Sequence, residues 1–507
     1  GSSDTVGAVV LQNGTITGTS GVLSGTSYSF REGTVSAIIA GGAAVVTRVA
    51  TNTAVDSVVT MTRDNTYTGA TTITSGILKL GATGGGTNTP LGTSAGGVAI
   101  ASGGALDLNG FTLGTAEAIT SLAGTGFGAS GSSNMGAIMN SSGSSASYSG
   151  ALTLTAAARV NADAGVMTIS GNASGNFALT FGGFSNMTYS GVRSGTSTIV
   201  KDGIGVLTLS NGNSSYTGVT TISAGTVKIG AASVGGTNSP LGTTAAATTV
   251  ALGSRLDING FNLGIAEPLT LNGVGYGLGD FASGALMNSS GSSVTYTGLI
   301  TLGSASTIKA DFGDISLTAA GTISGATFVL TLGGTSSGTL ASIVGTTTGG
   351  IIKIGTGTWT LSGANTYTGV TTINMGTLRL GATGGATNTP LGTTTIPTTI
   401  ISGAVLDLNG FTLGTAELLG INGRGINDGG ALINNSAGGV TYSGGISQST
   451  DSRITNSGAG LLTLTGGVTG AFALYTGGSG NITHSSGVLG MAAGTLTKQG
   501  AGTLTVT

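Results

Sequence analysis

The sequence predicts an all-β fold, a right-handed parallel β-helix (β-solenoid) built of three repeats of about 150 residues. The first observation is repetition: "TNTPLGT" at 87–93 returns as "TNSPLGT" at 237–243 and as "TNTPLGT" at 387–393. The second is a succession of short alternating runs, such as "VMTIS" and "VLTLS", that end at Gly, Asn or Ser. The third is composition. With 99 Gly among 507 residues, 6% charged and 5% aromatic residues, the chain suits narrow coils better than a sandwich core.

The spacing of the repeated blocks sets the predicted domain organisation. The block "ALDLNGFTLGTAE" at 105–117 has near copies at 255–267 and 405–417. Its acidic residues recur at intervals of 150: Asp107, Asp257 and Asp407, and Glu117, Glu267 and Glu417. The predicted divisions are an N-terminal segment with a divergent partial repeat (1–64) and three repeats (65–212, 213–364 and 365–507). Coils of about 20 residues would stack them as one continuous solenoid.

The two ends of the sequence carry separate expectations. The partial repeat is predicted because "IIAGGAAVVTRV" at 38–49 resembles "IVGTTTGGIIKI" at 343–354. The chain opens with "GSSDTV", without Met or a signal peptide, which indicates a processed product or a piece of something longer. The closing "GTLTVT" at 502–507 shows no capping helix or polar loop. We therefore expect that coil to be covered by more of the same chain or by another copy stacked end to end.

Charge and cysteine content exclude several classes of function. The formal net charge is -2 and the 15 basic residues are scattered singly, so we expect no nucleic-acid partner. The chain has no Cys, which excludes disulfides and thiolate metal sites. It has no apolar run of about 18 residues, so no transmembrane segment is predicted. We also expect no cofactor and no bound metal.

Two stretches carry a family resemblance. "GTWTLSGANTYTGVTTINMGTLRLG" at 357–381 and "GVLTLSNGNSSYTGVTTISAGTVKIG" at 205–230 closely resemble the autotransporter-associated β-strand repeat. "NTYTGATTITSGILKLG" at 65–81 resembles it from its middle onward. That repeat occurs in the passenger regions of autotransporters and in other large bacterial surface proteins. The resemblance implies a secreted β-helical stalk, export across a bacterial envelope and a location at the cell surface or outside the cell.

On these grounds we predict a structural role without enzymatic activity, as a rigid stalk or fibre subunit that can assemble end to end. The main alternative is an adhesin that binds host, cell or glycan surfaces. Two further alternatives are a polysaccharide-acting enzyme and an ice-binding protein. The Thr-rich stretch "TTTIPTTI" at 393–400 suggests the latter, although an ice-binding face would need the same Thr pair on one side of successive coils.

The residue patterns that point to catalysis are weak. Asp311 and Asp314 are the nearest acidic pair, and we interpret "ADFGDIS" as a solvated turn. Ser94 in "GTSAG" fits a nucleophile motif, which would also need a strand-to-helix turn and a partner such as His484, the only His. "GFGASG" at 126–131 fits a dinucleotide motif by chance in a Gly-rich chain. We therefore assign no catalytic, cofactor-binding or metal-binding residue.

The residues that recur with the repeat are interpreted as structural. Strand alternation predicts that Asp107 and its equivalents point outward, before a turn at Asn109–Gly110. Trp359 is expected in an apolar inward slot. Two further sets are assigned by type: outward strand charges (Lys79, Lys228 and Arg379) and rings that pack at coil corners (Tyr67, Tyr216 and Tyr367).

Overall fold

The computed structural model describes residues 3–42, 46–48, 57–127, 136–277, 283–394, 396–485 and 489–507. These residues form short strands and turns with a single helical turn, the 3-10 segment η2 (Ile426–Asp428). The predicted all-β class is therefore confirmed. In the described ranges, no helix has the length and apolar character needed to cross a bilayer. Parts of the predicted likeness at 38–49 and of the motif at 126–131 lie outside the described residues.

The chain forms two compact units. Unit 1 comprises residues 1–248 and 263–265, and unit 2 comprises residues 249–262 and 266–507. The boundary crosses strand β26 (Thr248–Val250). Each unit is a stack of coils in which a strand pairs in parallel with the strand about 20 residues further along the chain, as in Met167↔Met187 and Met187↔Leu207. This pairing is that of a parallel β-solenoid, as predicted.

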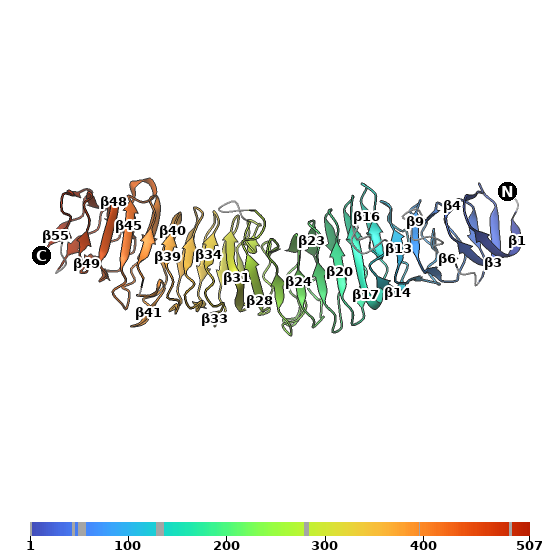
Figure 1. Ribbon diagram of the computed structural model, residues 1–507, viewed down its shortest axis with the longest axis horizontal. Coiled ribbons are helices and arrows are strands. Elements are labelled where there is room, and N and C mark those ends of the chain that lie inside the picture. Colours follow the sequence, from blue (N-terminus) through green and yellow to red (C-terminus); the bar gives the residue numbers. More distant parts are fainter. Residues whose placement is uncertain are drawn as a thin grey trace. The chain divides into compact units, whose positions relative to one another are not determined.

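In unit 1 the paired strands form columns, and Figure 1 shows the successive strands lying side by side. One column consists of β2 (Thr15–Ile16), β4 (Gly33–Val35), β7 (Val58–Met61), β9 (Gly76–Leu80), β13 (Gly104–Asp107), β15 (Ile138–Asn140), the end of β17 (Leu152–Ala162), β20 (Leu179–Gly182), β22 (Ile199–Lys201) and β24 (Thr220–Ile222). A second contains β1 (Asp4–Leu11), β3 (Val22–Phe30), β6 (Val46–Arg48), β8 (Thr71–Ile73), β12 (Val98–Ile100), β14 (Ile119–Gly124), the start of β17 and β19 (Ala173–Ser174). A third contains β16 (Ala146–Tyr148), β18 (Met167–Ile169), β21 (Met187–Tyr189), β23 (Val206–Leu209) and β25 (Thr226–Ile229), while β5 (Ile38–Ala40) pairs with β3.

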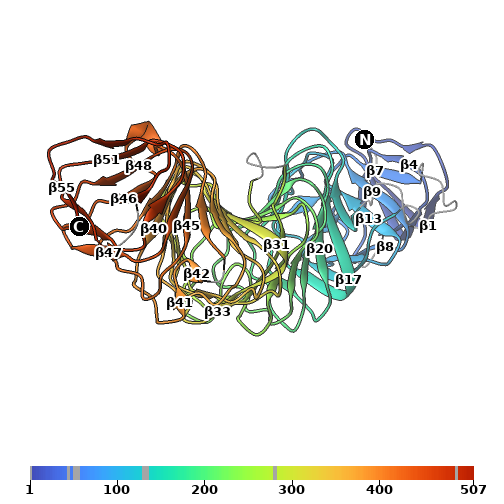
Figure 2. The ribbon, with the colours of Figure 1, turned by 60° about the vertical axis from the view of Figure 1, so that its left-hand side comes forward.

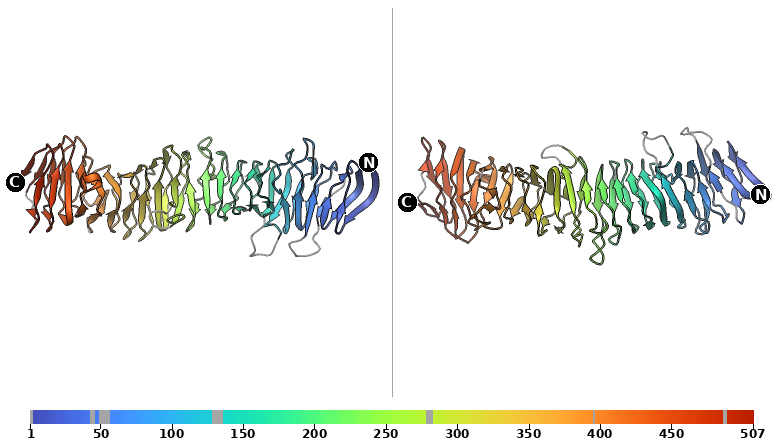
Figure 3. Two further views of the ribbon diagram at one scale, coloured as in Figure 1. Left: turned by 90° about the horizontal axis from the view of Figure 1, so that it is seen from above. Right: turned by 60° about the horizontal axis from the view of Figure 1, so that its bottom comes forward.

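Unit 2 is built in the same way, and Figures 2 and 3 show its coils stacked one behind another. One column contains β27 (Arg255–Asp257), β29 (Leu286–Asn288), the end of β31 (Ile300–Ala310), β34 (Leu330–Gly333), β37 (Ile351–Lys353), β39 (Thr371–Ile373), β43 (Thr398–Ile400), β45 (Leu419–Gly423), the start of β48 (Ile446–Asn456), β50 (Val468–Thr469) and β53 (Leu489–Gly490). The next contains β30 (Val294–Tyr296), β32 (Ile315–Leu317), β35 (Gly338–Leu340), β38 (Thr358–Leu361), β40 (Gly376–Leu380), β44 (Ala404–Asp407), β46 (Leu432–Asn434), the end of β48, β51 (Leu474–Gly477) and β54 (Leu496–Lys498).

The remaining strands of unit 2 are β28 (Leu269–Gly273), which pairs with the start of β31, the pair β33 (Thr322–Ile323) and β36 (Ile343–Val344), and the column β47 (Val440–Tyr442), β49 (Leu462–Leu464), β52 (Ile482–His484) and β55 (Leu504–Val506). Two antiparallel hairpins interrupt the coils: β10 (Asn88–Thr89) with β11 (Gly92–Thr93) in unit 1, and β41 (Asn388–Thr389) with β42 (Gly392–Thr393) in unit 2. Each hairpin contains the "TPLG" part of a repeated block. The hairpins therefore mark where the repeat departs from regular coils.

The repeat does not contain a whole number of coils. In unit 1, the strand of the first "TTI" motif is β8, whereas the strand of the second "TTI" motif, β24, belongs to the column that contains β9. In unit 2, the column of β30 continues through β46, while its repeat equivalent β47 starts the neighbouring column. Equivalent segments of successive repeats therefore lie in neighbouring columns and face different directions within each unit. This argues against an ice-binding face made of Thr pairs that recur with the repeat.

Candidate functional site

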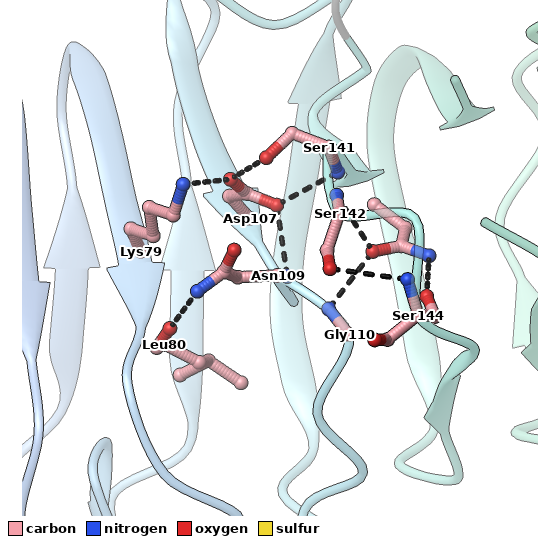
Figure 4. A network of polar contacts seen from close by, with 9 residues as sticks. Lys79, Leu80, Asp107, Asn109, Gly110, Ser141, Ser142 and Ser144 are labelled. Atoms are coloured by element: carbon pink, nitrogen blue, oxygen red, sulfur yellow. Dashed lines mark hydrogen bonds and ion pairs between the residues drawn. The ribbon is translucent and has the colours of Figure 1, made fainter. Parts of the chain in front are cut away.

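The recurring aspartate lies at a coil corner that is shown in Figure 4. Asp107 is only 2% exposed, although it pairs in register with the outward Lys79 and so lies on the predicted outward face of its strand. One carboxylate oxygen accepts hydrogen bonds from the backbone N–H of Asn109 (2.9 Å) and of Ser141 (3.1 Å), and the other accepts from Ser141 Oγ (2.6 Å). The side chain is nevertheless covered because Asp107 ends its strand, where the next coil packs over the carboxylate. The predicted turn is confirmed, since Asn109 and Gly110 both have positive φ.

The other two copies of this corner are also buried. Asp257 accepts from the N–H of Asn259 and of Ser289, and from Ser289 Oγ at 2.5 Å. Asp407 accepts from the N–H of Asn409 at 3.0 Å. Asp257 is 4% exposed and Asp407 is 1% exposed, so the face that alternation predicts as outward is covered at these corners too. The recurrence of this carboxylate reflects a bridge between coils.

Two of the predicted strand charges complete this corner. Lys79 Nζ lies 3.7 Å from Asp107 Oδ2, and Arg379 Nε lies 3.0 Å from Asp407 Oδ2. The side chains of Lys79 and Arg379 are 33% and 41% exposed, which agrees with the predicted outward direction, and Lys228 is half-buried. The basic residue therefore covers a buried carboxylate from the neighbouring strand. Such a partly exposed pair contributes about 1 kcal/mol or less.

The blocks that repeat most faithfully meet in a buried polar junction, defined in unit 1 by Tyr67, Thr71, Thr89 and Glu117. Tyr67 Oη lies 2.6 Å from Thr71 Oγ1, which itself donates to the carbonyl of Leu91. Thr89 Oγ1 lies 2.9 Å from Glu117 Oε1. The blocks "NTYTG", "TNTPLGT" and "LGTAE" are thus joined by hydrogen bonds. The tyrosine ring is fully buried, in agreement with the predicted packing role.

Unit 2 contains an equivalent polar junction. Tyr367 Oη lies 2.6 Å from Thr371 Oγ1, which donates to the carbonyl of Leu391. Here the partner of Glu417 Oε1 is Thr398 Oγ1, at 3.0 Å. Within unit 1, Tyr216 and Thr220 repeat the first contact at 2.5 Å. The repeated blocks therefore tie distant parts of a repeat together, and nothing in this geometry offers a ligand access.

The glutamate of each polar junction carries a perturbed pKa. Burial raises the pKa of Glu117, although the hydrogen bond from Thr89 opposes the rise. Burial also raises the pKa of Glu417, to about 7, against hydrogen bonds from Thr398. In both residues the second oxygen, Oε2, is buried without a hydrogen-bond partner. A carboxyl group in such a place favours its neutral, protonated form.

Buried lysines that the sequence analysis missed bridge successive coils within each unit. Lys353 Nζ is buried and donates to the carbonyls of Ile354 (2.8 Å), Gly355 (2.7 Å) and, in the next coil, Met375 (3.0 Å). Lys201 donates in the same way to Gly203 and Ala224. Burial lowers the pKa of Lys201 to about 8 and that of Lys353 to about 7. The sequence pattern that could have indicated these lysines is a Lys that ends an apolar strand two residues before a Gly. It occurs in "TIVKDG", "IIKIG" and "LTKQG".

We expect Lys353→Met to destabilise unit 2 by about 3 kcal/mol, because methionine fills the space but leaves one buried and two partly buried carbonyls without their donor. The measurement is urea denaturation followed by the fluorescence of Trp359, the only Trp, which is buried in the same unit. Lys498→Met is the matched control. Within the described part of the chain its exposed ammonium donates to the carbonyls of Gln499 and Gly500 and to no residue of another coil, so a small change is expected. Equal losses in the two variants would contradict the bridging role.

The structure does not assemble the weak catalytic patterns. Asp311 lies in the predicted turn between β31 and β32, and Asp314 ends it with its carboxylate accepting from the N–H of Ser337. Ser94 is exposed in a turn of unit 1, whereas His484 is buried in unit 2, where burial lowers its pKa. Across the described ranges, no three His, Asp or Glu side chains are grouped so that they could hold a metal ion.

Stacked parallel coils joined by buried polar bridges define the class of this protein, a parallel β-solenoid. Comparison with known proteins indicates the type of solenoid. The family model of the passenger-associated-transport repeat matches residues 57–80, 199–229 and 351–380. The chain is also similar to the adhesin BmaC autotransporter of Brucella suis biovar 1 (strain 1330), with 30% identity over 290 residues. That match covers 56% of this chain and 7% of the Brucella protein. No solved structure gives a significant match.

These matches confirm the resemblance found in the sequence, because the three repeat matches fall on the stretches that carry it. The chain carries β-helical repeats of the autotransporter passenger type. They indicate a location at the bacterial cell surface or outside the cell. The chain spans only a small part of the length of the relative that it matches.

Proposed function

We propose that this chain is a section of a rigid surface stalk in which the repeats form one continuous solenoid and repetition sets its length. The observation that carries the proposal is the position of the repeat-defining residues: Tyr67, Thr89 and Glu117 are buried and bridge parts of a repeat. A repeated ligand site would instead leave such residues accessible. The proposal assigns no catalytic role.

The stalk is tested by deleting one repeat length, residues 213–364, which joins equivalent positions of two repeats. The variant should stay folded, and small-angle scattering should show a maximum dimension shorter by about 30 Å, from roughly six coils at about 4.8 Å each. Deletion of residues 213–354 is the control, because it breaks the repeat and should lose cooperative unfolding. An unchanged dimension in the first variant would refute the stalk. End-to-end association of copies stays a prediction, tested by light scattering across concentrations.

An adhesive role is the second candidate, and the similarity to a protein described as an adhesin favours it. In this case the solenoid both carries and displays a binding surface. Binding of the purified chain to a panel of host-type glycans and to cell surfaces tests it. If the chain binds neither glycans nor cells, the adhesive role is refuted and the stalk is the remaining proposal.

A further inference from the structure

A shallow cleft opens at one coil corner of unit 1. Its volume is about 170 Å³, and it is lined by Arg159, Asn161, Asp163, Gly183, Phe184, Asp202, Gly203 and Ile204. Phe184 is 66% exposed and Ile204 is 69% exposed, and they occupy the corner in successive coils. Two large apolar side chains exposed together beside polar groups are typical of an interaction site.

The polar side of the cleft is a connected chain of side chains. The guanidinium of Arg159 contacts the carboxylate of Asp202, and its Nη2 donates to Asn161 Oδ1 at 3.0 Å. Asn161 in turn donates through Nδ2 to Asp163. Arg159 is 7% exposed, whereas Asp202 remains 30% exposed at the side chain. The groups are thus held in place by one another. The carboxylates of Asp163 and Asp202 reach the surface, whereas Asn161 is 1% exposed.

Gly182 explains how this chain of contacts spans three coils. Arg159 and Asp202 are 43 residues apart, and Gly182 lies between them in the column. A Cβ on Gly182 would overlap the guanidinium of Arg159. Only glycine at this position lets the arginine pass over the intervening coil.

The other repeats provide the comparison that makes this corner unusual. The eighth residue of the long strand is Arg159 in β17, Thr307 in β31 and Arg453 in β48. The two exposed corner positions, Phe184 and Ile204, correspond to Thr335 and Thr356 in the second repeat and to Ser479 and Ala501 in the third. The coil is therefore built equally well with small or polar residues there, so folding does not require Phe184 and Ile204.

We propose that this cleft is a binding subsite for a neutral sugar residue of a glycan. The proposal rests on the adhesive role given above as the second candidate. A pyranose has an apolar face that can lie on Phe184 and Ile204 and hydroxyls that can bond to the carboxylates of Asp163 and Asp202. The carboxylates of Asp163 and Asp202 offset the charges of Arg159 and the neighbouring Lys201, which disfavours acidic sugars.

The test uses the full chain on an array of neutral and sialylated glycans, followed by calorimetric titration with the neutral glycan that gives the strongest signal. The variant F184T/I204T inserts the residues that the second repeat carries at this corner, so the fold should be retained. We expect its affinity to fall at least tenfold. Phe312→Thr is the matched control, since Phe312 is 73% exposed in unit 2 and should not affect binding.

The possible outcomes separate the cleft from the adhesive role. Binding of a neutral glycan that F184T/I204T abolishes supports the proposal. Binding that survives in F184T/I204T overturns the cleft but keeps the adhesive role. Selective binding of sialylated glycans or of proteins overturns the assignment to neutral sugars. If the chain binds no glycan at all, the assignment of the cleft as a sugar-binding subsite is overturned.

Discussion

Replacing Trp359 with alanine is expected to lower the free energy of unfolding of unit 2 by about 3–5 kcal/mol. The indole is completely buried, and its Nε1 donates to the carbonyl of Gly333 at 2.9 Å. Alanine would leave both a cavity and an unpaired carbonyl. Thermal and urea unfolding followed by circular dichroism measure the effect. A loss below about 1 kcal/mol would contradict the account.

A glycine in the neighbouring coil makes room for the indole ring of Trp359 and allows a more specific prediction. Gly338 is the strand partner of Trp359, and a Cβ on it would come within 2.5 Å of the indole ring. In repeat 1 the equivalent pair is Met187 with Leu207. A large and a small residue thus replace two residues of middle size, so that the volume is kept across two coils.

The double variant G338M/W359L, which copies the pair of repeat 1, should therefore be more stable than either single variant. Gly338→Met alone should be severely destabilising, since its side chain would enter the space of the indole. Trp359→Leu alone should leave a cavity. A double-mutant cycle measures the coupling, which we expect at about 2–3 kcal/mol in favour of the pair. Additive losses would show that the two coils do not share this space.

The packing of Trp359 also shows which structural features can be predicted from the sequence. Alternation within "GTWTLS" places the indole inward, as the structure confirms. The compensation at Gly338 could not be read from the sequence, because the identity of the residue stacked one coil away depends on coil length at that point. Coil length changes along each repeat, since Asp107 pairs 28 residues back with Lys79 and Leu106 pairs 32 residues ahead with Ile138.

The candidate sites show the same limit. The recurrence of Asp107 and of Tyr67 correctly indicated repeated corners, and alternation gave the face of the aspartate but not its burial. Alternation describes a strand, whereas a corner residue is covered by the turn of the adjoining coil. The cleft beside Phe184 was missed for the opposite reason, because its residues depart from the repeat and only stacking brings Arg159 and Asp202 together.

The stability of unit 2 is expected to fall as pH rises from about 4.5 to 7 because of Glu417. Its carboxyl is 1% exposed, and burial raises its pKa from 4.5 to about 7. The facing titratable groups are Tyr367 and Tyr442, and burial raises the pKa of each above 10. Tyr442 donates its hydroxyl to the backbone carbonyl of Glu417 at 2.8 Å. Neither tyrosine changes charge in this pH range.

The sign follows from which state holds the proton more tightly. The folded chain binds the Glu417 proton at pH values where the unfolded chain has already released it. Protonation therefore favours folding, and its contribution is fully present below about pH 4.5 and is lost as pH rises through 7. A rise of the pKa from 4.5 to about 7 corresponds to about 3 kcal/mol.

Glu417→Gln should remove this dependence, since glutamine keeps the shape and the acceptor for Thr398 but does not titrate. We expect the variant to match the parent at pH 4 and to exceed its stability by about 3 kcal/mol at pH 8. Urea unfolding followed by Trp359 fluorescence reports on unit 2, and taking the difference at each pH cancels every other titrating group. Glu32→Gln, in unit 1, is the control and should leave the difference flat. A flat difference for Glu417→Gln would mean that the folded chain holds this carboxyl ionised, with water or a cation paired to the oxygen that now lacks a partner.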